Sequence, residues 1–158
     1  QRQLYDDRAS HLHRAAEHRF VGSVLSTSSI MDRYLGYVKA LLRAGLPIRD
    51  DWRLEDRDDR GLFIPFTLPH EMPEAFVCNC DEVAYNLVET LKRNGYRVPQ
   101  DVAVTGYDDY RYSTICSPQL TSYRVDLDGM AKTVVAQLRR KMAHKLPLPP
   151  PSSCPAAL

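Results

Sequence analysis

The chain has 158 residues and a net charge of +1, enough length for one domain with a hydrophobic core and no overall bias toward nucleic acid or acidic partners. Its composition is typical of a soluble globular protein, and no run of about 18 apolar residues predicts a membrane span. The start, QRQLYDDRAS, lacks the apolar core of a signal peptide, and the four cysteines show no obvious pairing. We therefore expect a protein of the reducing cytoplasm without a membrane partner.

The first third of the chain predicts a strand and a helix after a polar start. Residues 1–19 are rich in His and Arg and predict at most a short helix. Residues 20–25 are an apolar run typical of a strand. Ser29 and Asp32 resemble a capping box at a helix start, and Gly45 with Pro47 ends that helix. Its apolar residues recur at helical spacing: Met31, Tyr34, Leu35, Val38, Leu41 and Leu42.

The segment from residue 52 to residue 73 is less regular. A short strand is expected over 52–54, followed by a charged turn over 55–60. Residues 62–66 are apolar but flanked by Gly61 and interrupted by Pro65, so that a helix and a strand remain equally open. Pro69 and Pro73 frame a loop.

The segment from residue 75 to residue 109 predicts a strand–helix–strand unit. Residues 75–79 and 102–106 are buried-strand runs. Between them lies an amphipathic helix that Asp81 caps at its start and Gly95 ends in a left-handed turn. A unit of this length is a right-handed crossover between parallel strands.

The end of the chain predicts a loop, a strand, a helix and a tail. The loop covers residues 110–118 and the strand residues 121–125. An amphipathic helix follows over residues 127–143, with Arg139, Arg140 and Lys141 in its last turns, where cations favour the helix dipole. Residues 145–158 contain five prolines and predict an unpacked tail.

Polar residues follow both strands of the central unit at the same edge of the predicted sheet. Cys80 and Asp81 follow one strand, and Asp108 and Asp109 follow the other. Open α/β sheets bind ligands at this carboxyl edge, where a carboxylate can accept hydrogen bonds from ligand hydroxyls. The alternative is a turn cap with solvated acids. Arg33 lies near the start of a helix, where a cation is unfavourable. It is either part of this site or an ordinary surface arginine.

Other motifs give no catalytic or metal site. Cys78 and Cys80 are followed by no second cysteine pair at metal-ligand spacing. Residues 56–67 have a faint likeness to a calcium loop, but Arg60 occupies a ligand position. No glycine-rich phosphate loop, nucleophile elbow or zinc-protease motif occurs. We therefore expect no metal, no cofactor, no catalytic residue and no enzyme activity.

Three stretches of the chain resemble the lactose/galactose repressor family of bacterial transcription regulators, in the same order and spacing. They are STSSIMDRYLGYVKALLRAGLP at 26–47, MPEAFVCNCDEVAYNLVETLKRNGYRVPQDVAVTGYDD at 72–109 and SPQLTSYRVDLDGMAKTVVAQL at 117–138. The resemblance implies the periplasmic-binding-protein fold: an α/β lobe with a mainly parallel sheet and helices on both faces. It implies an effector-binding lobe at 20–144, a remnant of a preceding lobe or a flexible arm at 1–19, and a proline-rich tail at 145–158.

The resemblance also implies site residues. Arg33 matches an arginine that commonly contacts the sugar, and Asp108 an aspartate that commonly accepts hydroxyl bonds. Cys80 stands where the family often has a ligand-binding asparagine, beside the matching Asp81. We thus expect these four residues to bind a small, sugar-like effector.

The expected function is effector binding and dimerisation in a regulator whose DNA affinity the effector switches. DNA would be bound only through a helix-turn-helix region absent from this chain. The first alternative is a free periplasmic-type sugar-binding protein. A less favoured alternative is a small hydrolase that uses Asp108 or Asp109 as its base.

Overall fold

The structure is a computed structural model that describes residues 17–49, 51 and 53–143. The expected N-terminal helix and the proline-rich tail lie outside these residues. The chain divides into two compact units, Gln1–Arg124 and Val125–Leu158.

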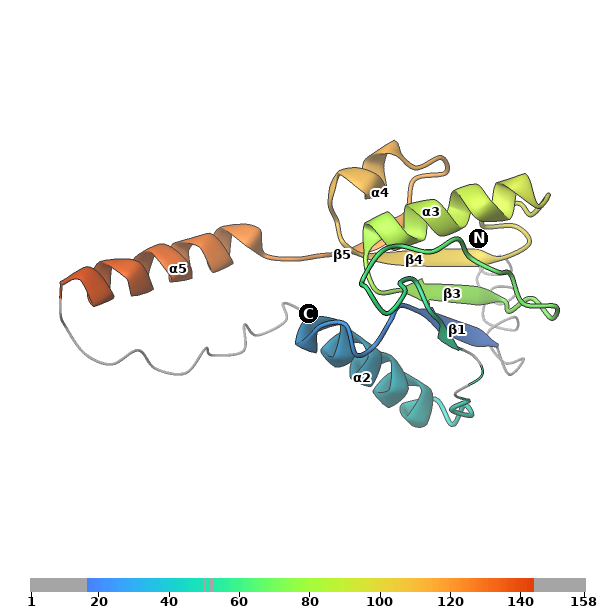
Figure 1. Ribbon diagram of the computed structural model, residues 1–158, viewed down its shortest axis with the longest axis horizontal. Helices are drawn as coiled ribbons and strands as arrows, with labels where there is room; N and C mark the ends of the chain where they lie inside the picture. Colours follow the sequence, from blue (N-terminus) through green and yellow to red (C-terminus); the bar gives the residue numbers. More distant parts are fainter. Residues whose placement is uncertain (1–16, 50, 52, 144–158) are drawn as a thin grey trace, which may run out of the picture. The chain divides into compact units, whose positions relative to one another are not determined.

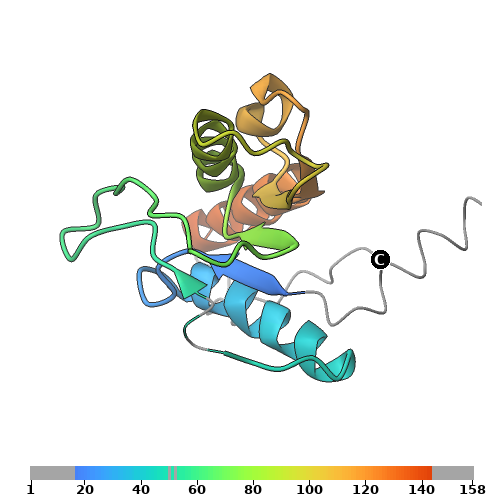
Figure 2. The ribbon, with the colours of Figure 1, turned by 90° about the vertical axis from the view of Figure 1, so that its right-hand side faces the viewer.

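The first unit is built on five parallel strands in the order β2-β1-β3-β4-β5. Helix α2 covers one face of the sheet, and α3 and α4 cover the other (Figures 1 and 2). The predicted three-layer α/β fold is therefore confirmed. The strands are β1 (His18–Val21), β2 (Arg53–Leu54), β3 (Ala75–Cys78), β4 (Ala103–Asp108) and β5 (Thr121–Arg124), and the helices are α2 (Ser28–Arg43), α3 (Asp81–Arg93) and α4 (Arg111–Ile115).

Helix α2 begins at Ser28, one residue before the predicted start. The capping residue is Thr27, whose Oγ1 accepts a hydrogen bond from the Ile30 amide at 3.2 Å, so the predicted Ser29–Asp32 capping box is wrong. Thr27 is in the extended conformation that a cap needs. The predicted stop is confirmed, since Gly45 takes a positive φ of 67° just past the helix.

Helix α3 begins after β3 without a side-chain cap. Cys80 is its N-cap residue, and Asp81 is its first helical residue rather than the predicted cap. The end at Gly95 is confirmed: its φ is +86°, and the Tyr96 amide donates to the Leu91 carbonyl at 3.0 Å.

Three further elements differ from their predictions. The segment 110–118 is not only a loop, because it contains the short helix α4. The apolar residues 62–66 form neither a named helix nor a named strand, and Phe63 makes an isolated antiparallel bridge with Arg57. β4 also runs to Asp108, two residues beyond its predicted end.

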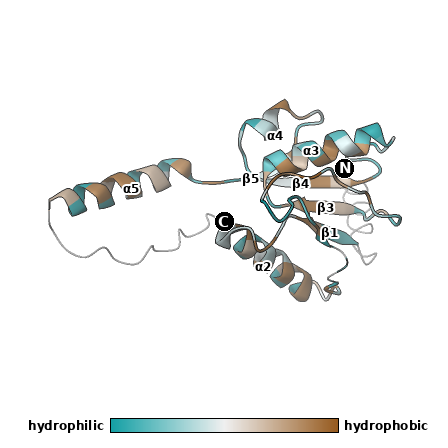
Figure 3. Cartoon of the chain, viewed as in Figure 1, coloured by the Kyte–Doolittle hydropathy of each residue, from teal (hydrophilic) through white to brown (hydrophobic). Residues whose placement is uncertain are grey.

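The sheet separates two apolar layers. Parts of the β3 and β4 ribbons are brown in Figure 3, the colour of hydrophobic residues. The larger layer lies on the α3 side, where every second strand residue packs against the helix. It is formed mainly by Val21, Phe76, Cys78, Val83, Leu87, Leu91, Val102 and Val104. The smaller layer lies under α2 and consists of Phe20, Val24 and Ile30, with Tyr34, Tyr37 and Val77 around them. Cys78, Cys80 and Cys116 are free thiols, in keeping with the expected absence of pairing between Cys78 and Cys80.

The second unit contains helix α5 (Leu127–Met142), which matches its prediction within one residue. Asp126 caps it by accepting a hydrogen bond from the Gly129 amide at 2.9 Å. No α5 residue is buried, and its large apolar side chains are about half exposed or more: Leu127, Met130, Val134, Val135, Leu138 and Met142. Within the described chain, no helix is long and apolar enough to cross a bilayer.

Candidate functional site

The topology brings the predicted site residues to one edge of the sheet. With this strand order, β2 is added on one side of β1 and β3 on the other, so the switch point of the sheet lies between β1 and β3. Ligands of open α/β sheets bind outside the carboxyl ends of the strands at such a switch point. Ser23 follows β1, Asn79 and Cys80 follow β3, and Asp108 ends β4, so all four lie at this edge.

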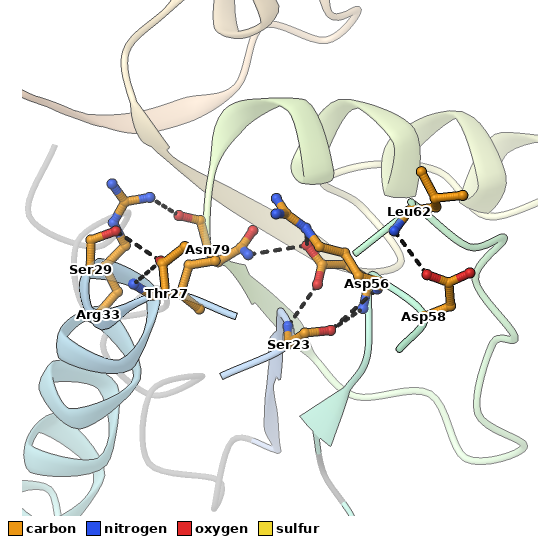
Figure 4. A network of polar contacts seen from close by, with 10 residues as sticks. Ser23, Thr27, Ser29, Arg33, Asp56, Asp58, Leu62 and Asn79 are labelled. Atoms are coloured by element: carbon orange, nitrogen blue, oxygen red, sulfur yellow. Dashed lines mark hydrogen bonds and ion pairs between the residues drawn. The ribbon is translucent and has the colours of Figure 1, made fainter. Parts of the chain in front are cut away.

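Arg33 reaches the edge from α2 and is held there by three contacts. Its Nη1 donates to the Asn79 carbonyl at 2.5 Å, and its Nη2 donates to Asp108 Oδ1 at 3.1 Å. Its Cζ lies 4.1 Å from the centroid of the Tyr107 ring. Figure 4 shows the side chain turned toward Asn79. Since α2 starts at Ser28, Arg33 lies in the second turn of the helix and not at its very start. The unfavourable helix dipole is therefore no longer a reason to assign Arg33 a role, and its three contacts are the evidence instead.

Asp108 ends β4 in a conformation that L residues rarely adopt. Its φ is +111°, and that of Asp109 is +51°. Backbone strain of this kind costs free energy and clusters at functional sites. Burial raises the pKa of the Asp108 carboxyl, while the Arg33 charge lowers it and nearby Asp81 raises it. The Asp108 side chain is 35% exposed, so it is open to a ligand although Arg33 is already bonded to it.

Asp81 occupies the predicted edge but faces inward. It is fully buried, its Oδ2 accepts from the Tyr110 amide at 2.7 Å, and its Oδ1 accepts from the Ser122 hydroxyl at 2.5 Å. Gly106 runs directly beside this carboxylate, where a Cβ would collide with Oδ1. The carboxylate therefore ties α3, β5 and the start of α4 together.

Asp109 is likewise bonded within the protein. Its Oδ2 accepts from Arg124 Nε and its Oδ1 from the Ser113 hydroxyl. The Arg124 hydrogen bond, followed by that of Ser113, lowers the pKa of this carboxyl. Of the two adjacent acids, Asp108 has the more exposed side chain, 35% against 22% for Asp109.

Cys80 is partly exposed at the start of α3. Burial is the main cause that raises the pKa of its thiol, and the Asp108 charge adds to it. A neutral thiol is a weak hydrogen-bond donor and acceptor, unlike the amide that the resembled family often has at this position.

A buried polar network beside Arg33 was missed in the sequence. Asp56, wholly buried, accepts from the Ser23 amide at 2.7 Å and from Asn79 Nδ2 at 3.1 Å (Figure 4). The Ser23 hydroxyl in turn accepts from the amides of Asp56 and Arg57. The network fixes Asn79, whose carbonyl holds Arg33. Asp56 gave a sequence signal only as part of the rejected calcium loop. In the described part of the chain, no group of three acidic, His or Cys residues is arranged to hold a metal.

Known proteins match the chain over most of its length. A family model for the periplasmic binding protein-like domain matches residues 9–158. The HTH-type transcriptional repressor PurR of Glaesserella parasuis is 33% identical over 106 residues, which cover 65% of this chain and 31% of that protein. PurR of Yersinia pestis is 29% identical over 136 residues, covering 81% and 40%. The chain thus spans between 31% and 40% of these relatives' length.

Solved structures share the fold. The transcriptional regulator CelR in complex with cellobiose superposes with a TM-score of 0.73 at 21% identity, covering 90% of this chain and 44% of that one. The Escherichia coli transcriptional repressor AscG superposes with a TM-score of 0.67 at 21% identity, covering 89% and 53%. A regulator from Lactobacillus casei with bound glucose gives a TM-score of 0.67 at 19% identity, covering 93% and 57%. At these identities the likeness shows the fold alone.

Proposed function

The chain belongs to the periplasmic binding protein-like domain family, in the form found in LacI/GalR-type transcriptional regulators, and we propose that it binds the small-molecule effector of such a regulator. In the complete protein, an effector that binds one conformation more tightly shifts the population toward it and so changes the affinity for DNA. DNA contact would belong to a helix-turn-helix region outside this chain. As part of a transcription regulator, the protein would act in the cytoplasm.

The observation that carries this proposal is the Arg33–Asp108 pair at the β1/β3 switch point. A donor and an acceptor lie 3.1 Å apart at the carboxyl edge, and both side chains remain partly exposed. The strained backbone of Asp108 supports a functional rather than a purely structural role. The pair is suited to a ligand with neighbouring hydroxyl groups, because such a ligand accepts from the guanidinium and donates to the carboxylate.

We propose a sugar-like, polyhydroxylated effector. Arg33 and Asp108 would contact it directly, and Cys80 would line the same edge. Asp81 would act indirectly, because its buried carboxylate already bonds Tyr110 and Ser122 and holds the loop after Asp108. The complexes of structural neighbours with cellobiose and glucose fit this ligand class.

The alternatives have less support. A free sugar-binding protein would have the same fold, but the curated relatives are named as repressors. A hydrolase using Asp108 or Asp109 would need a free base. Arg33 is bonded to Asp108, and Arg124 and Ser113 to Asp109.

A homodimer is a further part of the proposal. Tyr37 on α2 and Tyr85 on α3 are candidate residues for a dimer surface. Tyr37 instead packs on Phe20 and donates to the His18 carbonyl, and Tyr85 packs on Tyr112. These contacts support an intramolecular role for both rings. Light scattering at micromolar concentration decides between a monomer and the proposed dimer of this chain.

Calorimetry with glucose, cellobiose and sucrose tests the ligand site. We expect one sugar to bind and Asp108→Ala to weaken its binding at least about tenfold, since a hydrogen bond to a charged group contributes about 1.5–3 kcal/mol. Asp59→Ala removes an exposed carboxylate in the charged turn and serves as the matched control, with unchanged affinity. Equal affinity of wild type and Asp108→Ala would remove Asp108 from the site. Absence of binding by all three sugars would count against the ligand class.

A further inference from the structure

Arg33 is one layer of a three-layer stack on the α2 face of the sheet. Its Cζ lies 4.1 Å from the centroid of the Tyr107 ring, and the Tyr107 and Tyr123 rings stack at 4.9 Å with an interplanar angle of 23°. Tyr107 of β4 and Tyr123 of β5 are direct partners in the strand register. Because β4 lies between β3 and β5, the Tyr107 ring stands between the guanidinium and the second ring.

On the opposite, α3-side face of β4 and β5, a strand residue contacts the buried Asp81 instead of Arg33. Ser122, next to Tyr123, points to the α3 side and bonds the buried Asp81. Alternation along β5 therefore puts Tyr123 on the α2 side, where it is 42% exposed and available to support Tyr107.

The contacts of Arg33 fix both the position and the plane of its guanidinium. A guanidinium has five N–H donors, of which the Asn79 carbonyl and the Asp108 carboxylate take two in the described part of the chain. Two hydrogen bonds at one end still allow the long side chain to tilt. An aromatic face beneath the group limits that tilt, so that the three remaining N–H donors keep one direction.

We propose that Tyr107, backed by Tyr123, is a positioning residue that sets the plane of the Arg33 guanidinium for ligand recognition. The inference rests on the proposed role of Arg33 in binding. It adds that selectivity is for oxygen acceptors that lie in the plane of the guanidinium. A purely structural alternative is that the two tyrosines act only as a stabilising cross-strand pair.

The two interpretations differ in what happens at Arg33 when the Tyr107 ring is removed. In the chain labelled with [15N]arginine, the Arg33 Nε–Hε signal is identified by its loss in Arg33→Lys. We expect Tyr107→Leu to shift this signal and to speed rotation about the Nε–Cζ bond about two- to thirtyfold, the factor that corresponds to a cation–π contact. Tyr107→Phe keeps the ring and should leave both quantities unchanged.

Two more variants complete the test. Tyr123→Leu, on the edge strand, should increase the rotation rate in the same direction but less, and it gives the answer if Tyr107→Leu does not fold. Tyr110→Leu is the matched control, because Tyr110 is an exposed tyrosine near the same edge and outside the stack. An Arg33 signal that is the same in wild type, Tyr107→Leu and Tyr123→Leu would overturn the proposal. No sugar is needed, so this result is independent of whether the effector has been found.

Discussion

Asp108 and Asp109 are neighbours in sequence, but their carboxylates have different partners at the carboxyl edge. Asp108 faces Arg33 and is partly open, whereas Asp109 is bonded to Arg124 and Ser113. Burial raises the pKa of the first carboxyl, and the Arg124 hydrogen bond lowers the pKa of the second. The adjacent acids should therefore titrate on opposite sides of the ordinary value of 3.8.

The two opposite pKa shifts change the free energy of unfolding with pH in opposite directions. The folded state binds a proton on Asp108 more readily than the unfolded state, so Asp108 makes folding less favourable as pH rises from 3.8 through its raised pKa. Asp109 contributes stability above pH 3.8 and loses it as pH falls through its lowered pKa. Carboxyl 13C NMR from pH 2 to 7, with Asp108→Asn and Asp109→Asn for assignment, measures both. A lower pKa for Asp108 than for Asp109 would contradict the geometry of the site.

Gly106 leaves no room for a side chain beside the buried Asp81 carboxylate. A Cβ on Gly106 would overlap Asp81 Oδ1, and the buried carboxylate cannot move without losing its bond to Ser122. We expect Gly106→Ala to lower the free energy of unfolding by about 1–3 kcal/mol. Gly36→Ala is the control, since nothing lies within 4 Å of its Cβ and it sits inside α2. That variant should gain about 0.5–1 kcal/mol. Urea denaturation compares the two, and equal stabilities would contradict the close packing at Asp81.

Individual side chains could be predicted from the sequence only in part. The position of Arg33 and Asp108 at one edge of the sheet was predictable, because Arg33 has a family counterpart and Asp108 comes at the end of a buried strand. The inward orientation of Asp81 could not be found, because it depends on Ser122, which is 41 residues away. Asp56 and Asn79 were missed for the same reason: their hydrogen bonds join segments that only the fold brings together.

Helix α2 positions Arg33, so the residues that cap the N-terminus of α2 contribute to the position of the Arg33 side chain. Thr27 caps it through its hydroxyl, whereas the Ser29 hydroxyl only bonds Thr27 Oγ1. Thr27→Ala should destabilise the protein by about 0.5–2 kcal/mol. Ser29→Ala should cost clearly less. Thermal unfolding of both variants measures this difference, and a larger loss in Ser29→Ala would show that the predicted capping box was correct after all.

Long periodic elements were predictable, and short ones were not. α2, α3 and α5 have repeating apolar faces, so their positions followed within a few residues. α4 has five residues, too few to show a helical period. Its start is also fixed by a distant residue, because the amide of its N-cap residue, Tyr110, donates to the Asp81 carboxylate. The segment 62–66 was ambiguous because Gly61 and Pro65 break up its short apolar run. In the structure, Phe66 packs on the core of the α3 side, whereas Leu62 and Phe63 are exposed.

For the whole molecule, the strand order sets the place of the site, because β2 lies on one side of β1 and β3 to β5 lie on the other, which makes the switch point between β1 and β3. With this strand order, right-handed connections put α2 on one face and α3 and α4 on the other. Parallel pairing was therefore predictable from the strand–helix–strand unit. The alignment of Arg33 with Asp108, 75 residues apart, needed the assembled sheet.

Effector binding at the carboxyl edge is tested most directly by a titration of the 15N-labelled chain with the tightest-binding sugar, followed through its amide NMR signals. If the carboxyl edge binds the effector, the largest shifts should fall on residues 79–81 and 107–109 and on the Arg33 side chain. Residues 92–98, at the end of α3 and beyond it, should change little. Saturable shifts confined to residues 92–98, with 79–81 and 107–109 unmoved, would contradict effector binding at the Arg33–Asp108 edge.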